Sequence, residues 1–458
     1  MIGIVSLALM QNTRAEFSSK LAFILAASGS AIGLGNIWGF PIQVAENGGG
    51  AFVVVYLILT FLLAYPVLMV ELIIGRHAKS NIVTSMRMVS GTRTKVFAGL
   101  TGFWGVVTAS LILSFYAIVA GWMVAFCLSA SFNLIGFNQF NQWLEDFSLS
   151  RNLIFTLVFY LFTIQIVAQG VTAGIEKWTT RLMPALIVLI IILIVYIAGQ
   201  EGAATGWRLY LQPDFSSLFE AELILSALGQ SFFSLSLGVG TMMIYGSYVS
   251  RSENLVRLGA SVAVVDVAIA FLAGLLVIPA MTVALHNGVE IYDGGKLIDS
   301  DGLIFNVLPA LFSTMGISGT ILAVIFFALM TIAAVTSSIS MLEVPVAYAA
   351  DRYEMKRSKA AHLVGTLIFI ISVIILINFS TLFSFVISLT TRYSEPLIGL
   401  LFCVFAGWVW QREKILAEIK QGLPEAEQTL FWKIWPTYIK YVCPVIISLI
   451  FWHTLVAS

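Results

Sequence analysis

The sequence predicts an all-α membrane protein with about eleven transmembrane helices. Of its 458 residues, 59% are hydrophobic and 10% are charged, and the mean hydropathy is +0.97. A soluble globular protein does not have this composition. Apolar runs of about 20 residues, the length that a helix needs to cross a bilayer, recur along nearly the whole chain. Lys and Arg residues gather in alternate connections between these runs, as they do in membrane proteins with several spans.

The order of the spans predicts their orientation. We expect spans centred near residues 33, 63, 113, 162, 189, 235, 269, 333, 368, 397 and 446. With the N-terminus in the cytoplasm, the Lys and Arg residues fall on the cytoplasmic side except Arg151, Arg208, Lys296 and Arg392. The positive-inside rule therefore predicts a multi-pass protein of the inner (plasma) membrane, with the N-terminus cytoplasmic and the C-terminus outside.

The domain organisation follows from the same reading. Residues 1–19 are expected to form a cytoplasmic N-terminal segment, and residues 20–458 a single transmembrane domain. The first ten residues are too short to span and lack a basic leader, so they are predicted to be neither a signal peptide nor a span. They are either an extension or a misplaced start. The net charge of zero indicates no nucleic-acid partner, and we find no nucleophile or metal set of an enzyme.

Two predicted spans are interrupted by glycine and serine at their middle. The first reads LAFILAASGSAIGLGNIWGFP and the sixth reads LGQSFFSLSLGVGTMMIYGSY. Irregular backbone at membrane depth survives only inside the protein or beside a cavity, where half-helix ends can bind anions and cations. Two such spans five apart predict an inverted repeat of residues about 20–200 and 218–411, with an extra helix at about 435–456. The alternative is helix packing through small residues.

Three longer motifs carry a resemblance to a known family. GSAIGLGNIWGFP followed by AENGGGAF, then FFSLSLGVG, then AAVTSSIS occur in this order. They resemble the neurotransmitter:sodium symporter family, and most closely its bacterial amino-acid branch of the leucine-transporter type. The resemblance implies sodium-coupled symport of a neutral, hydrophobic α-amino acid into the cell by alternating access. The alternatives are a transporter-like amino-acid sensor and a carrier of another small zwitterion.

The resemblance also implies two sodium sites, and the residue types suit them because sodium prefers oxygen ligands. The first site is expected at Ala31, Asn36, Ser234 and Asp266. The second is expected at Gly29, Ile32, Ala333, Thr336 and Ser337. The hydroxyls of Thr336 and Ser337 have an alternative role, since such groups in membrane helices often bond a carbonyl one turn back.

A substrate site between the broken spans is implied in the same way. Its expected residues are Ala31, Gly33, Leu34, Gly35, Ile112, Tyr116, Phe233, Ser234, Ser236, Val239, Ser338 and Met341. The amides near Leu34 and Gly35, with the Tyr116 hydroxyl, would hold a carboxylate. Amine carriers of the family place an aspartate where Gly33 stands, so this chain is expected to need a carboxylate on its ligand. The side-chain pocket suits a medium to large neutral group.

Chloride independence is expected from Asp266. Animal members bind chloride beside positions that match Tyr56, Gln230 and Ser234, and a fixed carboxylate can replace that charge. Asp266 is then either a direct sodium ligand or the substitute for chloride. The alternative is a buried acid bonded to neighbouring hydroxyls.

Gates are expected on both sides of the site. Arg14 and Asp351, with Tyr248 beside them, match the cytoplasmic gate of the family. On the outer side the family's Arg and Asp are replaced by Gly39 and Ile387. Arg392 either pairs with Glu395 on one helical face or points into the outer vestibule.

Overall fold

The computed structural model describes residues 14–137, 139–216, 218, 220–293, 296–297 and 303–457. Residues 1–13, most of the predicted N-terminal segment, lie outside this range. The helices before residue 220 are α2 (Lys20–Ala31), α3 (Phe40–Glu46), α4 (Gly50–Leu59), α5 (Tyr65–Ala78), α6 (Ile82–Val89), α7 (Lys95–Leu134), α8 (Asn141–Glu145), α9 (Leu149–Ala168), α10 (Lys177–Ala198) and α11 (Ala203–Leu211), with π-helical segments η1 (Gly35–Gly39), η2 (Thr60–Ala64) and η3 (Val171–Glu176).

The second half is also helical. Its α-helices are α12 (Ala221–Ser234), α13 (Thr241–Ser247), α14 (Leu255–His286), α16 (Leu308–Thr314), α17 (Gly316–Tyr353), α18 (Arg357–Ile377), α19 (Phe379–Ile387), α20 (Glu395–Val404), α21 (Arg412–Lys420), α22 (Leu430–Thr437) and α23 (Cys443–Ala457). The π-helical segments η4 (Leu303–Val307), η5 (Ser388–Ser394), η6 (Phe405–Val409) and η8 (Tyr438–Val442) and the 3₁₀ turn η7 (Ala426–Gln428) connect them. Strands β1 (Tyr292–Asp293) and β2 (Lys296–Leu297) form a short antiparallel pair.

The arrangement of spans agrees with the sequence. Within the described residues, eight helices are long and apolar enough to cross a membrane, and two bent pairs raise this number to ten. The sixth predicted span is the broken pair α12 and α13. Each predicted centre falls on a helix or between the two halves of a broken one. The last span runs Leu430–Leu455, so it begins a few residues before the predicted boundary.

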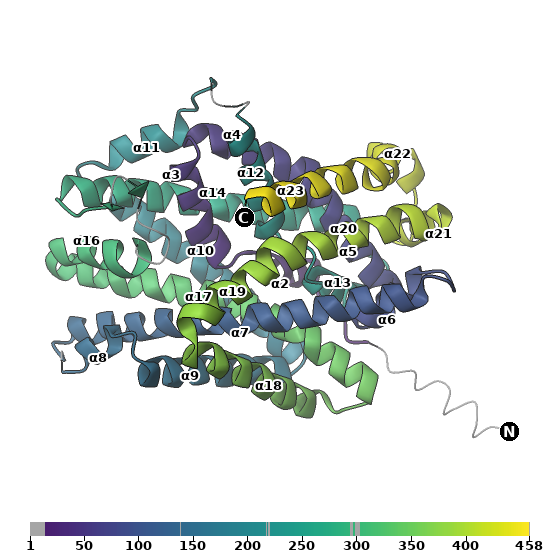
Figure 1. Cartoon of the computed structure of the whole chain (residues 1–458), viewed down its shortest axis with the longest axis horizontal. Helices are drawn as coiled ribbons and strands as arrows, with labels where there is room; N and C mark the ends of the chain where they lie inside the picture. The colour runs from purple at the N-terminus through teal and green to yellow at the C-terminus, as the bar shows by residue number, and fades with distance from the viewer. Residues whose placement is uncertain are drawn as a thin grey trace.

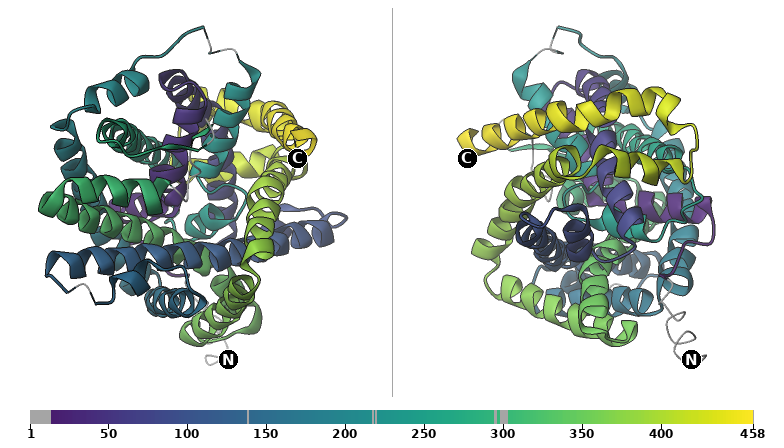
Figure 2. Two further views of the ribbon diagram at one scale, coloured as in Figure 1. Left: turned by 60° about the vertical axis from the view of Figure 1, so that its left-hand side comes forward. Right: turned by 90° about the vertical axis from the view of Figure 1, so that its right-hand side faces the viewer.

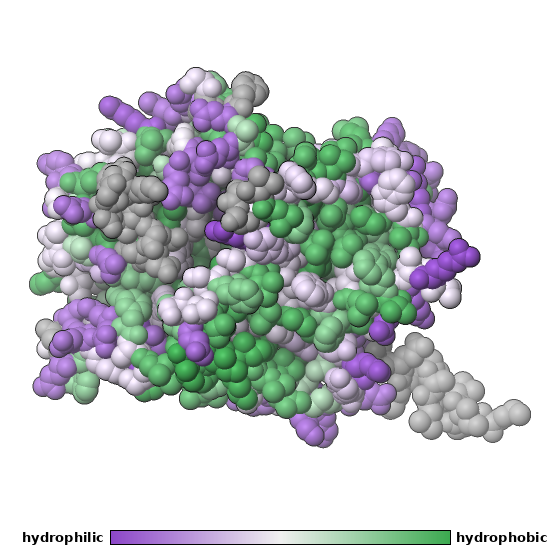
Figure 3. All heavy atoms as spheres, in the orientation of Figure 1, coloured by the Kyte–Doolittle hydropathy of each residue, from purple (hydrophilic) through white to green (hydrophobic). Residues whose placement is uncertain are grey.

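The long helices run along one axis of the molecule (Figure 1). α7 and α17, with 40 and 38 residues, pack against each other through the centre. The last span crosses one side of the molecule, beside α20 (Figure 2). Hydrophobic residues cover the middle of the face in Figure 3, and hydrophilic residues gather toward its two ends. This distribution is the one that a bilayer requires.

Several helices begin where the sequence supplies a cap. The Ser19 hydroxyl accepts from the Ala22 N–H at 3.1 Å and starts α2, and the Asn81 and Asn254 side chains do the same for α6 and α14. Such caps satisfy N–H groups that the first helical turn leaves unbonded. These polar residues therefore set the ends of apolar helices.

Candidate transport site

The first span is broken where its glycines lie. α2 ends at Ala31, and the chain resumes as η1 and α3 at an angle of 59°. A Cβ atom on Gly33 would lie 2.7 Å from Ser337 Oγ and 2.8 Å from the Tyr116 hydroxyl oxygen. The backbone at Gly33 therefore approaches two other spans so closely that a side chain there would displace their polar groups.

The sixth span is broken in the same way. Residues 235–240 separate α12 from α13, and Ser236, Gly238 and Gly240 have φ values of +51°, +80° and +84°. Glu71 of α5 satisfies backbone amides at this break. Its carboxylate accepts hydrogen bonds from Gly238 N at 2.8 Å and from Met243 N at 3.3 Å. The sequence reading missed Glu71. The signal was present, because it is a lone acid in an apolar span.

Three residues expected at the first sodium site form one buried network. Asn36 Nδ2 donates to Ser234 Oγ at 2.8 Å and to Asp266 Oδ1 at 2.7 Å. Ser234 Oγ donates to Asp266 Oδ2 at 2.8 Å. Ala31, the fourth residue, ends α2 at the edge of the same break. The break in the first span, the end of α12 and the middle of α14 thus meet at one carboxylate.

The region expected to replace chloride is only partly assembled. The Tyr56 hydroxyl donates to Ser234 Oγ at 3.0 Å and so extends the network around Asp266. The Gln230 amide instead donates to the Gly35 carbonyl at 3.1 Å. Its recorded contact is therefore with the break in the first span and not with Asp266.

The residues expected at the second sodium site gather between α2 and α17. Ser337 Oγ lies 3.3 Å from the Gly29 carbonyl oxygen and 3.1 Å from that of Ile32. Thr336 Oγ1 donates to the Ala333 carbonyl at 3.0 Å, within its own helix. Thr336 thus makes the hydrogen bond to a carbonyl one turn back that the sequence left open as an alternative to sodium binding. The Ser337 hydroxyl instead reaches across to the broken first span.

A cavity of about 50 Å³ lies between the two breaks. It is lined by Ala31, Gly33, Leu34, Gly35, Asn36, Ile112, Phe115, Tyr116, Phe233, Ser236, Val239, Thr241, Ser337, Met341 and Glu395. The Leu34 N–H donates to the Tyr116 hydroxyl oxygen at 3.2 Å. The Leu34 amide and the Tyr116 hydroxyl, both expected to bind the substrate carboxylate, are thus in contact with each other.

Two of the expected substrate residues do not line this cavity. Ser234 belongs to the Asp266 network. Ser338 is buried, and its hydroxyl has no hydrogen-bond partner within the described ranges. The structure places Ser337 and not Ser338 on this cavity, so the assignment of Ser338 to the substrate site stays a prediction. Glu395, considered in the sequence only as a partner of Arg392, is the main unexpected residue in the lining of this cavity.

On the expected cytoplasmic side, the predicted gate residues are in contact. Arg14 Nη1 lies 2.8 Å from Asp351 Oδ2, Arg14 Nε donates to Ser247 Oγ at 2.8 Å, and the guanidinium lies 4.8 Å from the Tyr248 ring centre. Asn81 also donates to Asp351 through its backbone and side chain, at 2.9 and 3.1 Å. Burial lowers the pKa of Arg14, but Tyr248 and Asp351 raise it above its ordinary value, so the guanidinium stays charged.

On the expected outer side, a cavity of about 450 Å³ lies beside α12, α20 and α23. Ile387, Arg392 and Glu395 line it, and a Cβ on Gly39 would meet no atom within 4 Å. In the part of the chain that the structure describes, Arg392 and Glu395 form no salt bridge with each other. Glu395 also lines the smaller cavity, so it lies between the two.

Two broken spans that enclose a small cavity, with carbonyls, hydroxyls and a carboxylate beside it and a closed ion pair at one end, define an ion-coupled membrane carrier. The model of the Sodium:neurotransmitter symporter family matches residues 14–146 and 144–458. The chain belongs to this family, and it is therefore a sodium-dependent transporter and not an enzyme.

Individual relatives agree with this assignment. The chain is 33% identical over 451 residues to the "Uncharacterized sodium-dependent transporter YhdH" of Bacillus subtilis. The alignment covers 95% of this chain and 96% of that protein. It is 30% identical over 439 residues to an "Uncharacterized sodium-dependent transporter" of Methanocaldococcus jannaschii, over 92% of this chain and 87% of that one. Among solved structures, MhsT in complex with L-phenylalanine matches with a TM-score of 0.80 and 35% identity, over 96% of this chain and 100% of that chain.

Proposed function

We propose that this protein imports a neutral, hydrophobic α-amino acid together with sodium, by alternating access and without a need for chloride. The two sodium ions bind at the Asp266 network and between α2 and α17. The substrate binds in the small cavity, with its carboxylate at the Leu34 and Gly35 amides. The N-terminus and the gate formed by Arg14 and Asp351 face the cytoplasm.

The observation that carries this proposal is the close approach at Gly33. Tyr116 and Ser337 fill the space in which a side chain of residue 33 would lie, so the chain supplies no carboxylate of its own there. A ligand that completes the site must bring one, which favours an amino acid over an amine. The L-phenylalanine in the structure of MhsT is a ligand of this class.

Chloride independence is supported by the Asp266 carboxylate. It is buried and held by Asn36 and Ser234, next to the Tyr56 hydroxyl. A fixed negative charge at this place can balance sodium as a bound chloride would.

Uptake into proteoliposomes tests the proposal. Labelled amino acids, beginning with L-phenylalanine and other hydrophobic ones and including a decarboxylated amine, are supplied with an inward sodium gradient or with choline in its place. We expect sodium-driven accumulation of hydrophobic amino acids that is unchanged when gluconate replaces chloride. Binding without accumulation would indicate a sensor, and accumulation of the amine alone would contradict the carboxylate argument.

A further inference from the structure

A second cavity, of about 270 Å³, lies outside the transport site, between α21 and the last span. It is lined by Ala406, Gly407, Trp410, Arg412, Ile415, Trp435, Pro436, Thr437, Ile439, Lys440 and Tyr441. It belongs to the end of the molecule where α6, α21 and α22 lie, on the right in Figure 1. This end carries the Arg14–Asp351 pair, because Asn81 at the start of α6 donates to Asp351.

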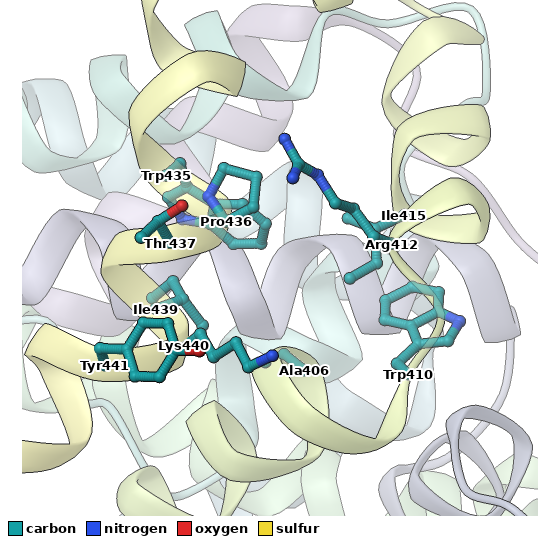
Figure 4. Close-up of a pocket in the computed structure, with 11 residues that line it drawn as sticks. Ala406, Trp410, Arg412, Ile415, Trp435, Pro436, Thr437, Ile439, Lys440 and Tyr441 are labelled. Carbon is teal, nitrogen blue, oxygen red and sulfur yellow. The ribbon is translucent and has the colours of Figure 1, made fainter.

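Two cations reach into this cavity from opposite sides. Figure 4 shows the Arg412 guanidinium directed into it from α21, and the Lys440 ammonium directed into it from the last span. No acidic residue lines the cavity. Among the residues that the structure describes, neither cation forms a salt bridge, and Glu427, an acid on the adjoining turn, is paired with Lys420 at 2.7 Å. The cavity lining therefore carries positive charge and no carboxylate, and the exposed Glu427, with which Arg412 also interacts electrostatically, is already paired with Lys420.

Aromatic rings place this charge at the edge of a membrane. The Lys440 ammonium lies 4.5 Å from the Trp408 ring centre and 5.4 Å from that of Tyr441, and both rings are exposed. The Arg412 guanidinium lies 5.4 Å from the Trp432 ring centre. Exposed Trp and Tyr residues on membrane helices gather at the level of lipid headgroups. The cations thus lie where the phosphate groups of lipids are found.

The cavity wall is held in place by close packing. A Cβ on Gly407 would lie 2.7 Å from the Lys440 Cα atom, and Trp408 Nε1 donates to the Lys440 carbonyl at 2.8 Å. Trp435, which lines the cavity, donates to the Pro66 carbonyl at 3.0 Å. The backbone of Lys440 is thereby fixed, so its side chain extends from a rigid wall of the cavity.

An apolar groove of about 230 Å³ lies against the same last span as the cavity. It shares Trp435 and is otherwise lined by Phe61, Leu62, Tyr65, Pro66, Leu430, Phe431, Ile434 and Tyr438. Leu62, Leu430 and Ile434 are more than half exposed, as residues that face lipid can be. A basic cavity and an apolar groove with one residue in common suit a molecule with an anionic head and a hydrocarbon tail.

We propose that this cavity binds the headgroup of an anionic phospholipid, with the phosphodiester between Arg412 and Lys440 and an acyl chain along the groove. Arginine and lysine are the residues that recognise phosphate, and basic pockets between membrane helices bind such headgroups. The shared chemistry of the ligand is a phosphate anion, and the groove favours a lipid as its source.

Native mass spectrometry of the full-length protein in detergent tests the lipid, with dioleoyl-phosphatidylglycerol and dioleoyl-phosphatidylcholine added in parallel. We expect retention of phosphatidylglycerol at concentrations at which phosphatidylcholine is lost. Arg412→Gln and Lys440→Gln should each weaken its affinity by about fivefold, and the double variant by about thirtyfold. The matched control is Lys414→Gln with Lys433→Gln, which removes two exposed cations of α21 and α22 outside the cavity.

Two further arms separate the possible sources of phosphate. Inorganic phosphate and the short-chain dihexanoyl-phosphatidylglycerol are titrated in the same preparation, with thermal unfolding as the readout. We expect much weaker protection by both than by the dioleoyl lipid. Equal binding of phosphatidylcholine, an unchanged affinity in a folded double variant, or an equal loss in the control would overturn the proposal. Equal protection by inorganic phosphate would overturn the assignment to a lipid.

Discussion

Single side chains decide how the second sodium site is built. Ser337 directs its hydroxyl at carbonyls of the broken span, whereas Thr336 bonds the Ala333 carbonyl of its own helix. The two hydroxyls are neighbours in sequence but occupy different hydrogen-bonding situations. They are therefore expected to contribute unequally to sodium binding.

We predict that Ser337→Ala weakens sodium affinity by about tenfold or more. The substitution removes one of the protein oxygens that would coordinate the charged ion in a buried site. Thr336→Ala should have a smaller effect, and the double variant the largest. The measurement is the sodium dependence of uptake. Thr331→Ala is the matched control, since this hydroxyl bonds the Phe327 carbonyl of the same helix at 2.8 Å. Unchanged sodium dependence in the double variant would exclude both hydroxyls from the site.

A second prediction concerns Asp266. Asp266→Asn preserves the shape of the side chain and removes its charge, so it should create a requirement for chloride or abolish transport. The measurement is uptake with chloride or gluconate as the anion, beside the wild type. A wild type that needs chloride would disprove the assignment of Asp266 as its substitute.

A third prediction concerns Arg392, which lines the outer cavity. Arg392→Ala should weaken substrate affinity or slow uptake. Adding Gly39→Arg together with Ile387→Asp to this variant should partly restore transport. Arg208→Ala removes an exposed arginine of α11 and serves as the control. If Arg392→Ala lowers only the amount of folded protein, with affinity and turnover per molecule intact, Arg392 is a structural residue.

At the scale of elements, the two breaks show what a sequence can predict. Glycine at the middle of an apolar span indicates an interrupted helix, and both predicted interruptions are present. The partners of the breaks were harder to predict. Glu71 and Glu395 are lone acids in apolar segments, and their positions mark them as functional candidates but do not reveal which distant backbone they meet. Ser337 lines the cavity and Ser338 does not, because one residue along a helix turns a side chain by about 100°.

The glycines of the first span give a paired prediction. Gly33→Ala should strongly reduce substrate binding, because the added methyl group would lie against Tyr116 and Ser337. Gly39→Ala, in the same broken span, has open space around it and should be close to neutral. Binding of labelled L-phenylalanine to the purified variants measures both. Equal effects would show that loss of glycine flexibility, and not the contact at residue 33, is responsible.

At the scale of the whole molecule, a buried ion pair joins α21 to α5. Arg76 Nε donates to Glu418 Oε1 at 2.7 Å, Arg76 Nη1 donates to the Glu253 carbonyl at 2.7 Å, and His77 Nδ1 lies 3.3 Å from Glu418 Oε2. Burial raises the pKa of Glu418, but the hydrogen bonds and charges of His77 and Arg76 lower it below the ordinary value. Three distant segments are thus tied together through the Arg76 guanidinium.

We predict that Glu418→Gln lowers the unfolding temperature in detergent, because it leaves the Arg76 charge buried without its partner. Breaking such a pair costs about 3 kcal/mol. Since folding depresses the pKa of Glu418, its contribution is complete above the ordinary glutamate pKa and is lost as pH falls through the depressed value. Glu413→Gln on the exposed face of α21 is the control. A variant as stable as the wild type at neutral pH would contradict this role.

The Glu71 carboxylate has a consequence for movement. It accepts hydrogen bonds from two amides at the break of the sixth span, and Gly75 and Gly246 bring α5 and α13 into direct backbone contact. If α13 moved without α5, the bond from Met243 would break and the buried carboxylate would lose one of its two partners. The two helices are therefore expected to travel as one rigid body through the transport cycle. The hinge is then expected elsewhere, before Gly238 in the unwound residues 235–237 and in the first span.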